Sequence, residues 1–253
     1  IEQGGGTALM FAARSGDLKS AQLLVEAGSD VNELSAFGTS PIMMAVHGGN
    51  SELLDYLLEN GADPDLNGSG QTALHDAVLR GNPETVEVLI KHDANLEAVL
   101  ESPTPTRRQS TDYSFHDALI GATPLWLAAR FSEPLIMEAL LDAGADPLVV
   151  VEINYPAQRL GELYIADEGP INLVMAAVGL GHPRLRMSWG TAERRAGQLQ
   201  DRQSLVLDSV RVAVSAGAEI NAQNTDGQTA LSFAKQRRYG SVVAFLEAAG
   251  AAE

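Results

Sequence analysis

The sequence has no cysteine and few aromatic residues, and each scarcity excludes a class of protein. Without cysteine the chain has no disulfide, no thiolate nucleophile and no zinc–thiolate site. Aromatic residues make up 5% of the 253 residues, whereas hydrophobic residues together make up 45%. This balance favours many short helices that pack closely through aliphatic side chains.

Positive charge is also scarce. Lys and Arg number 17 against 33 Asp and Glu, which gives a formal net charge of −16. Because such a chain repels phosphate backbones and anionic lipid surfaces, we expect no nucleic-acid partner. No hydrophobic run approaches the roughly 20 residues needed to span a bilayer, so we expect no membrane insertion.

A five-residue motif, Gly-x-[Thr/Ser]-[Ala/Pro]-[Leu/Ile], recurs along the chain. Its five copies are GGTAL, GTSPI, GQTAL, GATPL and GQTAL, which begin at Gly5, Gly38, Gly70, Gly121 and Gly227. In the first three copies the Thr or Ser lies at Thr7, Ser40 and Thr72, which gives spacings of 33 and 32 residues. Self-similarity at this period predicts a repeat architecture.

The motif residues have physical reasons to recur. Thr or Ser before the first helical turn caps unpaired amides, and Pro41 and Pro124 fall where a helix can begin with proline. An alanine five residues after each Thr or Ser lets neighbouring helices approach closely. Glycines such as Gly61 follow the second helix of a unit, where a left-handed residue ends the helix, and Asp93 replaces that glycine in the third unit.

On these residues the chain resembles the ankyrin repeat family. The resemblance implies an all-α solenoid of about six helix-turn-helix units with short β-turn or finger loops and three insertions. The expected repeats span about 4–35, 37–68, 70–97, 121–148, a degenerate 169–222 and 226–253. The insertions span 96–120, 147–170 and 182–203.

The segments GATPLWLAAR and NAQNTDGQTALSFAKQRRYGSVVAFLEAAGA are also similar to the C-terminal end of bacterial, often exported, ankyrin proteins. Together with the lack of cysteine, this favours an exported or periplasmic location over the cytoplasm. Because the chain starts at Ile1 rather than Met, we expect that a segment upstream of it has been removed.

His75 and Asp76 are neighbours in QTALHDAVLRGN, which raises the question of a catalytic acid–base pair. In the ankyrin signature Thr-Pro-Leu-His, the histidine braces its own turn and the neighbouring unit, so the resemblance implies a structural role for His75. Asp76 is then an ordinary inner-helix residue. The other histidines show no metal-like spacing, so we expect no catalytic residue, no metal and no cofactor.

The insertions carry a second group of candidate residues. The first contains Arg107, Arg108, Tyr113 and Phe115, and the second contains Tyr155 and Tyr164 and is expected to form a short hairpin. The third is basic, with five Arg and one Trp, and is expected to be a tether or a further contact site. Either the insertions pack against the solenoid as decoration, or they bind a partner.

The ends of the inner helices supply the remaining candidates. The resemblance implies that partners dock there and on the projecting loops. The residues at these ends are Arg14, His47, Arg80, Arg130, Phe131 and Arg237. The cations in this set either interact only with the dipole of their own helix, or line a groove for a peptide or protein that carries carboxylates.

The sequence therefore predicts a non-enzymatic protein–protein interaction module. Two alternatives stay open. One is a small-molecule or catalytic pocket that the insertions build around Trp126, Tyr155 and Tyr164. The other is an accessory subunit that is permanently bound in a larger complex through the aliphatic run LVVVEI at 148–153.

Overall fold

The computed structural model describes residues 5–103, 115, 117–153, 169–180 and 202–252, and within them six helix pairs follow one another. We call the pairs units 1 to 6, the first helix of each the inner helix and the second the outer helix. The pairs are α1 (Ala8–Ser15) with α2 (Leu18–Glu26), α3 (Pro41–Gly48) with α4 (Ser51–Glu59), α5 (Ala73–Arg80) with α6 (Pro83–Lys91), α7 (Pro124–Arg130) with α8 (Pro134–Asp142), α9 (Leu173–Val178) with α11 (Arg202–Ser215), and α12 (Ala230–Arg237) with α13 (Gly240–Ala248). None of the described helices is long and apolar enough to cross a membrane.

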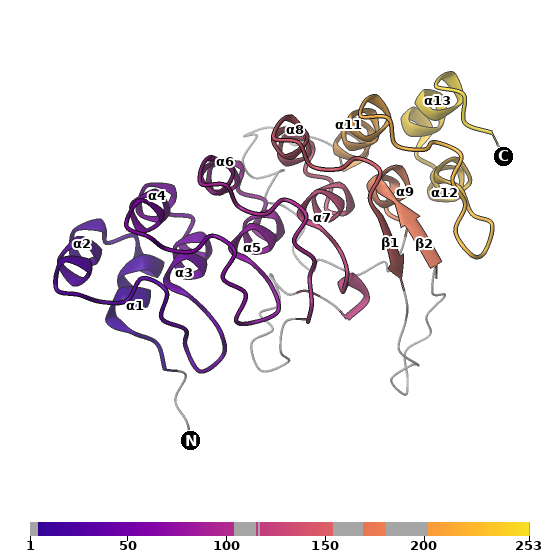
Figure 1. Ribbon diagram of the computed structural model, residues 1–253. Helices are drawn as coiled ribbons and strands as arrows, with labels where there is room; N and C mark the ends of the chain where they lie inside the picture. The colour runs from indigo at the N-terminus through magenta and orange to yellow at the C-terminus, as the bar shows by residue number, and fades with distance from the viewer. Residues whose placement is uncertain (1–4, 104–114, 116, 154–168, 181–201, 253) are drawn as a thin grey trace.

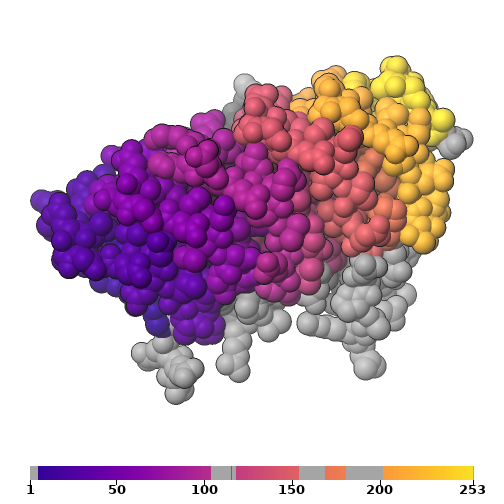
Figure 2. Space-filling model, viewed as in Figure 1, coloured from indigo at the N-terminus to yellow at the C-terminus, as the bar shows by residue number. Residues whose placement is uncertain are grey.

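The units are stacked in chain order, with the two termini at opposite ends of an elongated body (Figure 1). The inner helices form one row, the outer helices form a second row above it, and loops project downward from the inner row. Figure 2 shows the units succeeding one another along the body in close contact. Because one helix pair cannot bury its own apolar face, this stacking builds one continuous core.

The inner helices begin where the motif predicts. The hydroxyl of Thr7 accepts from the backbone N–H of Met10 at 3.2 Å, and Ser40, Thr123 and Thr229 cap their helices in the same way. Unit 5 lacks the Thr, and there the side chain of Asn172 accepts from Met175 at 3.0 Å. A side-chain cap thus defines the start of the degenerate unit as well.

The second residue after each outer helix takes the left-handed conformation that the sequence predicts. Gly61 has φ 89°, and Asp93 takes the same left-handed conformation with φ 59°. The small alanines predicted inside the stack are buried, with exposures between 0% and 7% for Ala12, Ala45, Ala77, Ala128 and Ala234.

A two-stranded sheet interrupts the helices between units 4 and 5. Strand β1 (Val150–Ile153) pairs antiparallel with β2 (Gly169–Asn172), with Val150 opposite Asn172. This confirms the predicted hairpin. Residues alternate along β1, so that Val151 and Ile153 are buried while Val150 points to solvent. A short 3-10 helix, η2 (Asp117–Leu119), precedes unit 4.

Candidate binding site

The structure places the predicted cationic residues in one row at the C-terminal ends of the inner helices. Arg14, His47, Arg80, Arg130 and Arg237 each lie in the last turn of an inner helix. Phe131 follows α7 as its C-cap, and the guanidinium of Arg237 lies 5.0 Å from the ring centre of Phe233. We call this set the arginine row.

Polar contacts between units 2 and 3 organise the middle of the arginine row. His47 Nε2 is hydrogen-bonded to the carboxylate of Asp76, and one terminal nitrogen of Arg80 donates to the carbonyl oxygen of His47 at 3.3 Å. Asp76 is buried, with 3% exposure. It is therefore not the ordinary inner-helix residue that the sequence predicted, because its carboxylate holds the imidazole of the preceding unit.

Asp76 keeps its charge in this setting. Burial acts to raise the pKa of its carboxyl, but the charge and hydrogen bond of His47 and the charge of Arg80 outweigh it, so the pKa lies below 3.8. A hint was present in the sequence. Leu79 occupies in unit 3 the position that His47 occupies in unit 2, and Asp76 lies one helical turn before Leu79. Asp76 is therefore on the part of α5 that lies near His47 of the preceding unit.

A surface depression of about 380 Å³ lies beside His47 and Arg80. It is lined by residues of the inner-to-outer turns of units 2 and 3, which are Val46, His47, Gly48, Gly49, Arg80, Gly81, Asn82 and Glu84. The arrangement offers cationic and hydrogen-bonding groups that suit recognition of a polar chain. Among the residues that the structure describes, no group of three or more His, Asp or Glu could hold a metal ion.

His75 has the structural role that the resemblance implies. Its Nδ1 accepts from the backbone N–H of Thr72 at 3.2 Å, and its Nε2 lies 3.3 Å from the carbonyl oxygen of Ala122 in the next unit. The side chain is fully buried, and burial lowers its pKa to about 4. A neutral ring without solvent access is a brace between two units rather than an acid–base catalyst.

Two aromatic candidates lie inside the molecule. Phe115 was predicted to contact a partner, but it is fully buried with its ring at 89° to that of His75, so its side chain offers no contact surface. Trp126 was the centre of the alternative small-molecule pocket. It too is fully buried, and its Nε1 donates to the carbonyl oxygen of Ile171 at 2.8 Å, which corrects that alternative.

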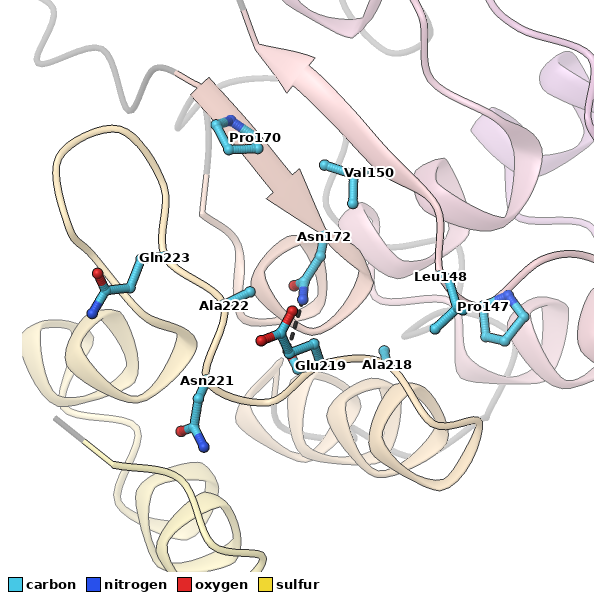
Figure 3. Close-up of a pocket in the computed structure, with 10 residues that line it drawn as sticks. All are labelled: Pro147, Leu148, Val150, Pro170, Asn172, Ala218, Glu219, Asn221, Ala222 and Gln223. Carbon is cyan, nitrogen blue, oxygen red and sulfur yellow. Dashed lines mark hydrogen bonds between the residues drawn. The ribbon is translucent and has the colours of Figure 1, made fainter.

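The remaining candidates, which are Arg107, Arg108, Tyr113, Tyr155 and Tyr164, lie outside the described residues, as does nearly all of the third insertion. A second pocket, of about 620 Å³, opens at the other end of the inner helices (Figure 3). It lies between the β1–β2 hairpin and the loop that follows α11.

The geometry of helix pairs, capped inner helices and projecting loops agrees with sequence comparison. The family model for three copies of the ankyrin repeat matches residues 9–99, and the single ankyrin repeat model matches 120–150. The chain is an ankyrin repeat protein. The degenerate unit 5 and unit 6 lie beyond these matches and have the same helix-pair organisation.

Curated relatives are similar to this ankyrin protein over part of its length. The probable E3 ubiquitin-protein ligase XBOS33 of Oryza sativa subsp. japonica is 33% identical over 57% of this chain. Ankyrin repeat and SAM domain-containing protein 6 of Rattus norvegicus is 42% identical over 32%. The chain spans only 27% and 9% of the lengths of these two relatives.

Solved structures with a similar fold extend over nearly the whole chain. An ankyrin repeat domain from Acinetobacter baumannii AYE has a TM-score of 0.65 at 19% identity and covers 96% of this chain and 98% of its own. A chain in the complex of the predatory endopeptidase Bd0816 of Bdellovibrio bacteriovorus with the immunity protein Bd3460 has a TM-score of 0.61 at 24% identity, with coverage of 96% and 98%. At these identities the likeness shows the fold alone.

Proposed function

We propose that this ankyrin protein is a non-enzymatic interaction module that binds a protein or peptide segment through the arginine row and the neighbouring finger loops. Ankyrin repeats are generally protein–protein interaction modules. The observation that supports this proposal most directly is the depression beside His47 and Arg80, where a guanidinium and an imidazole lie at the surface of a chain of net charge −16. The partner segment is expected to carry carboxylates.

The contacts around Asp76 support this role because they order the groups that would meet a partner. Its carboxylate fixes the imidazole of His47, and Arg80 is tied to the carbonyl oxygen of the same residue. Side chains that are ordered before binding lose less rotamer entropy when a partner arrives.

A selection from random peptides displayed on phage tests the proposal without a known partner. Peptides selected on the wild-type protein should be enriched in Asp and Glu. In fluorescence polarisation, Arg80→Gln should weaken a selected peptide about tenfold, which is equivalent to about 1.4 kcal/mol. The substitution removes the charge without placing a carboxylate next to Asp76.

Arg211→Gln is the matched control, because it removes an exposed cation from the outer helix α11, away from the C-terminal ends of the inner helices. We expect it to leave the peptide affinity unchanged. Thermal melts of both variants check that the fold is intact. Equal affinities for the two variants, or selected peptides without acidic residues, would contradict the proposal.

A further inference from the structure

Neighbouring loops that follow the outer helices are joined by a repeated side-chain hydrogen bond. At four of the five junctions between units, the residue four positions after the left-handed residue accepts from a backbone N–H of the next loop at 2.8 Å. The pairs are Asn32 with Asp63, Asp65 with Asn95, Glu97 with Asp146, and Asn221 with Ala252. We call these bonds the loop ladder.

The loop ladder is broken between units 4 and 5. There the position four residues after Gly144 is Leu148, which has no acceptor in its side chain. The backbone N–H in the equivalent place on the next loop is that of Glu219, two residues after Gly217. It has no hydrogen-bond partner within the described residues, whereas the equivalent amides of Asp63, Asn95, Asp146 and Ala252, which each follow a unit with an acceptor, all have one.

The 620 Å³ pocket opens at this break (Figure 3). Leu148 and Val150 line it from the side of the hairpin and are 64% and 52% exposed. Glu219 and Ala222 line it from the loop after α11, and Asn172 lies between the two walls. Asn172 donates through Nδ2 to the carbonyl oxygen of Glu219 at 2.7 Å, which fixes the position of the loop whose N–H is unpaired.

The charge around the pocket has one sign. Among its ten lining residues, the one ionisable side chain is that of Glu219, which is exposed. Asp146 and Glu152, which flank the lining residues of the hairpin wall, are exposed as well. A ligand that complements this pocket therefore brings a positive charge, an aliphatic group and a hydrogen-bond acceptor.

We propose that this pocket binds an extended segment of another protein in which an aliphatic residue is flanked by lysine or arginine. Its backbone carbonyl accepts from the N–H of Glu219, and its aliphatic side chain covers Leu148 and Val150. The neighbouring cation pairs with the Glu219 carboxylate. An extended peptide supplies a backbone acceptor and alternating side chains together, which is how peptides add to exposed backbone edges.

This site is separate from the arginine row. The pocket lies beside Asn172, the N-cap of α9, whereas the row lies at the C-terminal ends of the inner helices. Binding at one site does not require the other. The two proposals can therefore fail independently.

Nuclear magnetic resonance on the ¹⁵N-labelled protein tests the site with three end-blocked peptides, Gly-Lys-Ile-Lys-Gly, Gly-Glu-Ile-Glu-Gly and Gly-Lys-Ser-Lys-Gly. The first should move the amide proton resonance of Glu219 downfield, with a Kd of about 1 mM or tighter. The second peptide lacks the cations and the third lacks the aliphatic side chain, so each should bind about tenfold more weakly than the first or not at all.

Leu148→Asn supplies the missing acceptor and should weaken the first peptide about tenfold, because the N–H of Glu219 is then already paired. Leu135→Asn is the matched control, since Leu135 is 67% exposed on α8, outside the pocket. Equal affinities for the two variants would overturn the proposal. So would equal binding of the glutamate peptide, the absence of binding at about 1 mM, or resonance changes confined to the arginine row.

Discussion

The junction between units 3 and 4 differs from the junction between units 4 and 5 in how it is held together. In the first, His75 donates from Nε2 to Ala122 in the interior, while Glu97 bonds the N–H of Asp146 at the surface. In the second, the interior bond is present, from Trp126 to the carbonyl oxygen of Ile171, but the surface bond is missing. One surface is therefore closed and the other is open.

This difference shows that stacking and surface closure are independent in this solenoid. His75 and Trp126 are each the third residue of an inner helix, and each directs a ring nitrogen to the carbonyl of the residue before the next N-cap. Two chemically different rings thus perform the same task. Because the interior bond joins units 4 and 5, the loops there can separate and leave a pocket.

The largest expected effect comes from removing the interior bond at the open junction. Trp126→Ala should lower the free energy of unfolding by about 3–5 kcal/mol, because it empties a fully buried site and leaves Ile171 without its donor. Trp126→Phe keeps most of the volume and should cost about 1–3 kcal/mol. Urea denaturation measures both.

Phe11→Ala serves as the control for aromatic truncation, since Phe11 is 68% exposed on α1 and should cost little. A Trp126→Ala variant that is as stable as Phe11→Ala would contradict the interior role of the tryptophan. In that case the hairpin would have to be joined to unit 4 by other contacts.

The interior bond at the closed junction predicts a pH dependence. Burial lowers the pKa of His75 to about 4 from the ordinary 6.5, so the folded state binds fewer protons than the unfolded state between these values. Its contribution is complete above pH 6.5 and is lost as the pH falls toward 4. The free energy of unfolding should decrease by up to about 1.4 kcal/mol per pH unit in this window.

His75→Met tests this slope, because methionine occupies the same position as Met10 and Met43 in units 1 and 2. Chemical denaturation from pH 4 to 7 should give a difference between wild type and variant that narrows as the pH falls. A constant difference across the window would show that His75 is not held neutral by burial.

Sequence reasoning predicted the parts of this structure that depend on neighbouring residues. The N-caps, the left-handed Asp93 and the β1–β2 hairpin follow from local patterns and are present. It did not predict the burial of Phe115 or the bond between His47 and Asp76, because these depend on packing between units. The loop ladder could have been predicted from the sequence, because its acceptor residue has the same position in each unit. Leu148 is the one residue at that position, within the described loops, whose side chain cannot accept a hydrogen bond.

The smallest expected effect concerns the loop ladder itself. Glu97→Ala removes the surface bond from the closed junction and should cost about 0.5–1.5 kcal/mol, whereas Leu148→Asn adds the equivalent bond to the open junction and should stabilise by a similar or smaller amount. Amide hydrogen exchange should become faster at Asp146 in the first variant and slower at Glu219 in the second. If both amides exchange as in the wild type while stability changes, the effect does not pass through the ladder. Opposite changes at the two amides would show that a single side chain in each unit decides whether the surface between two loops is closed or available for binding.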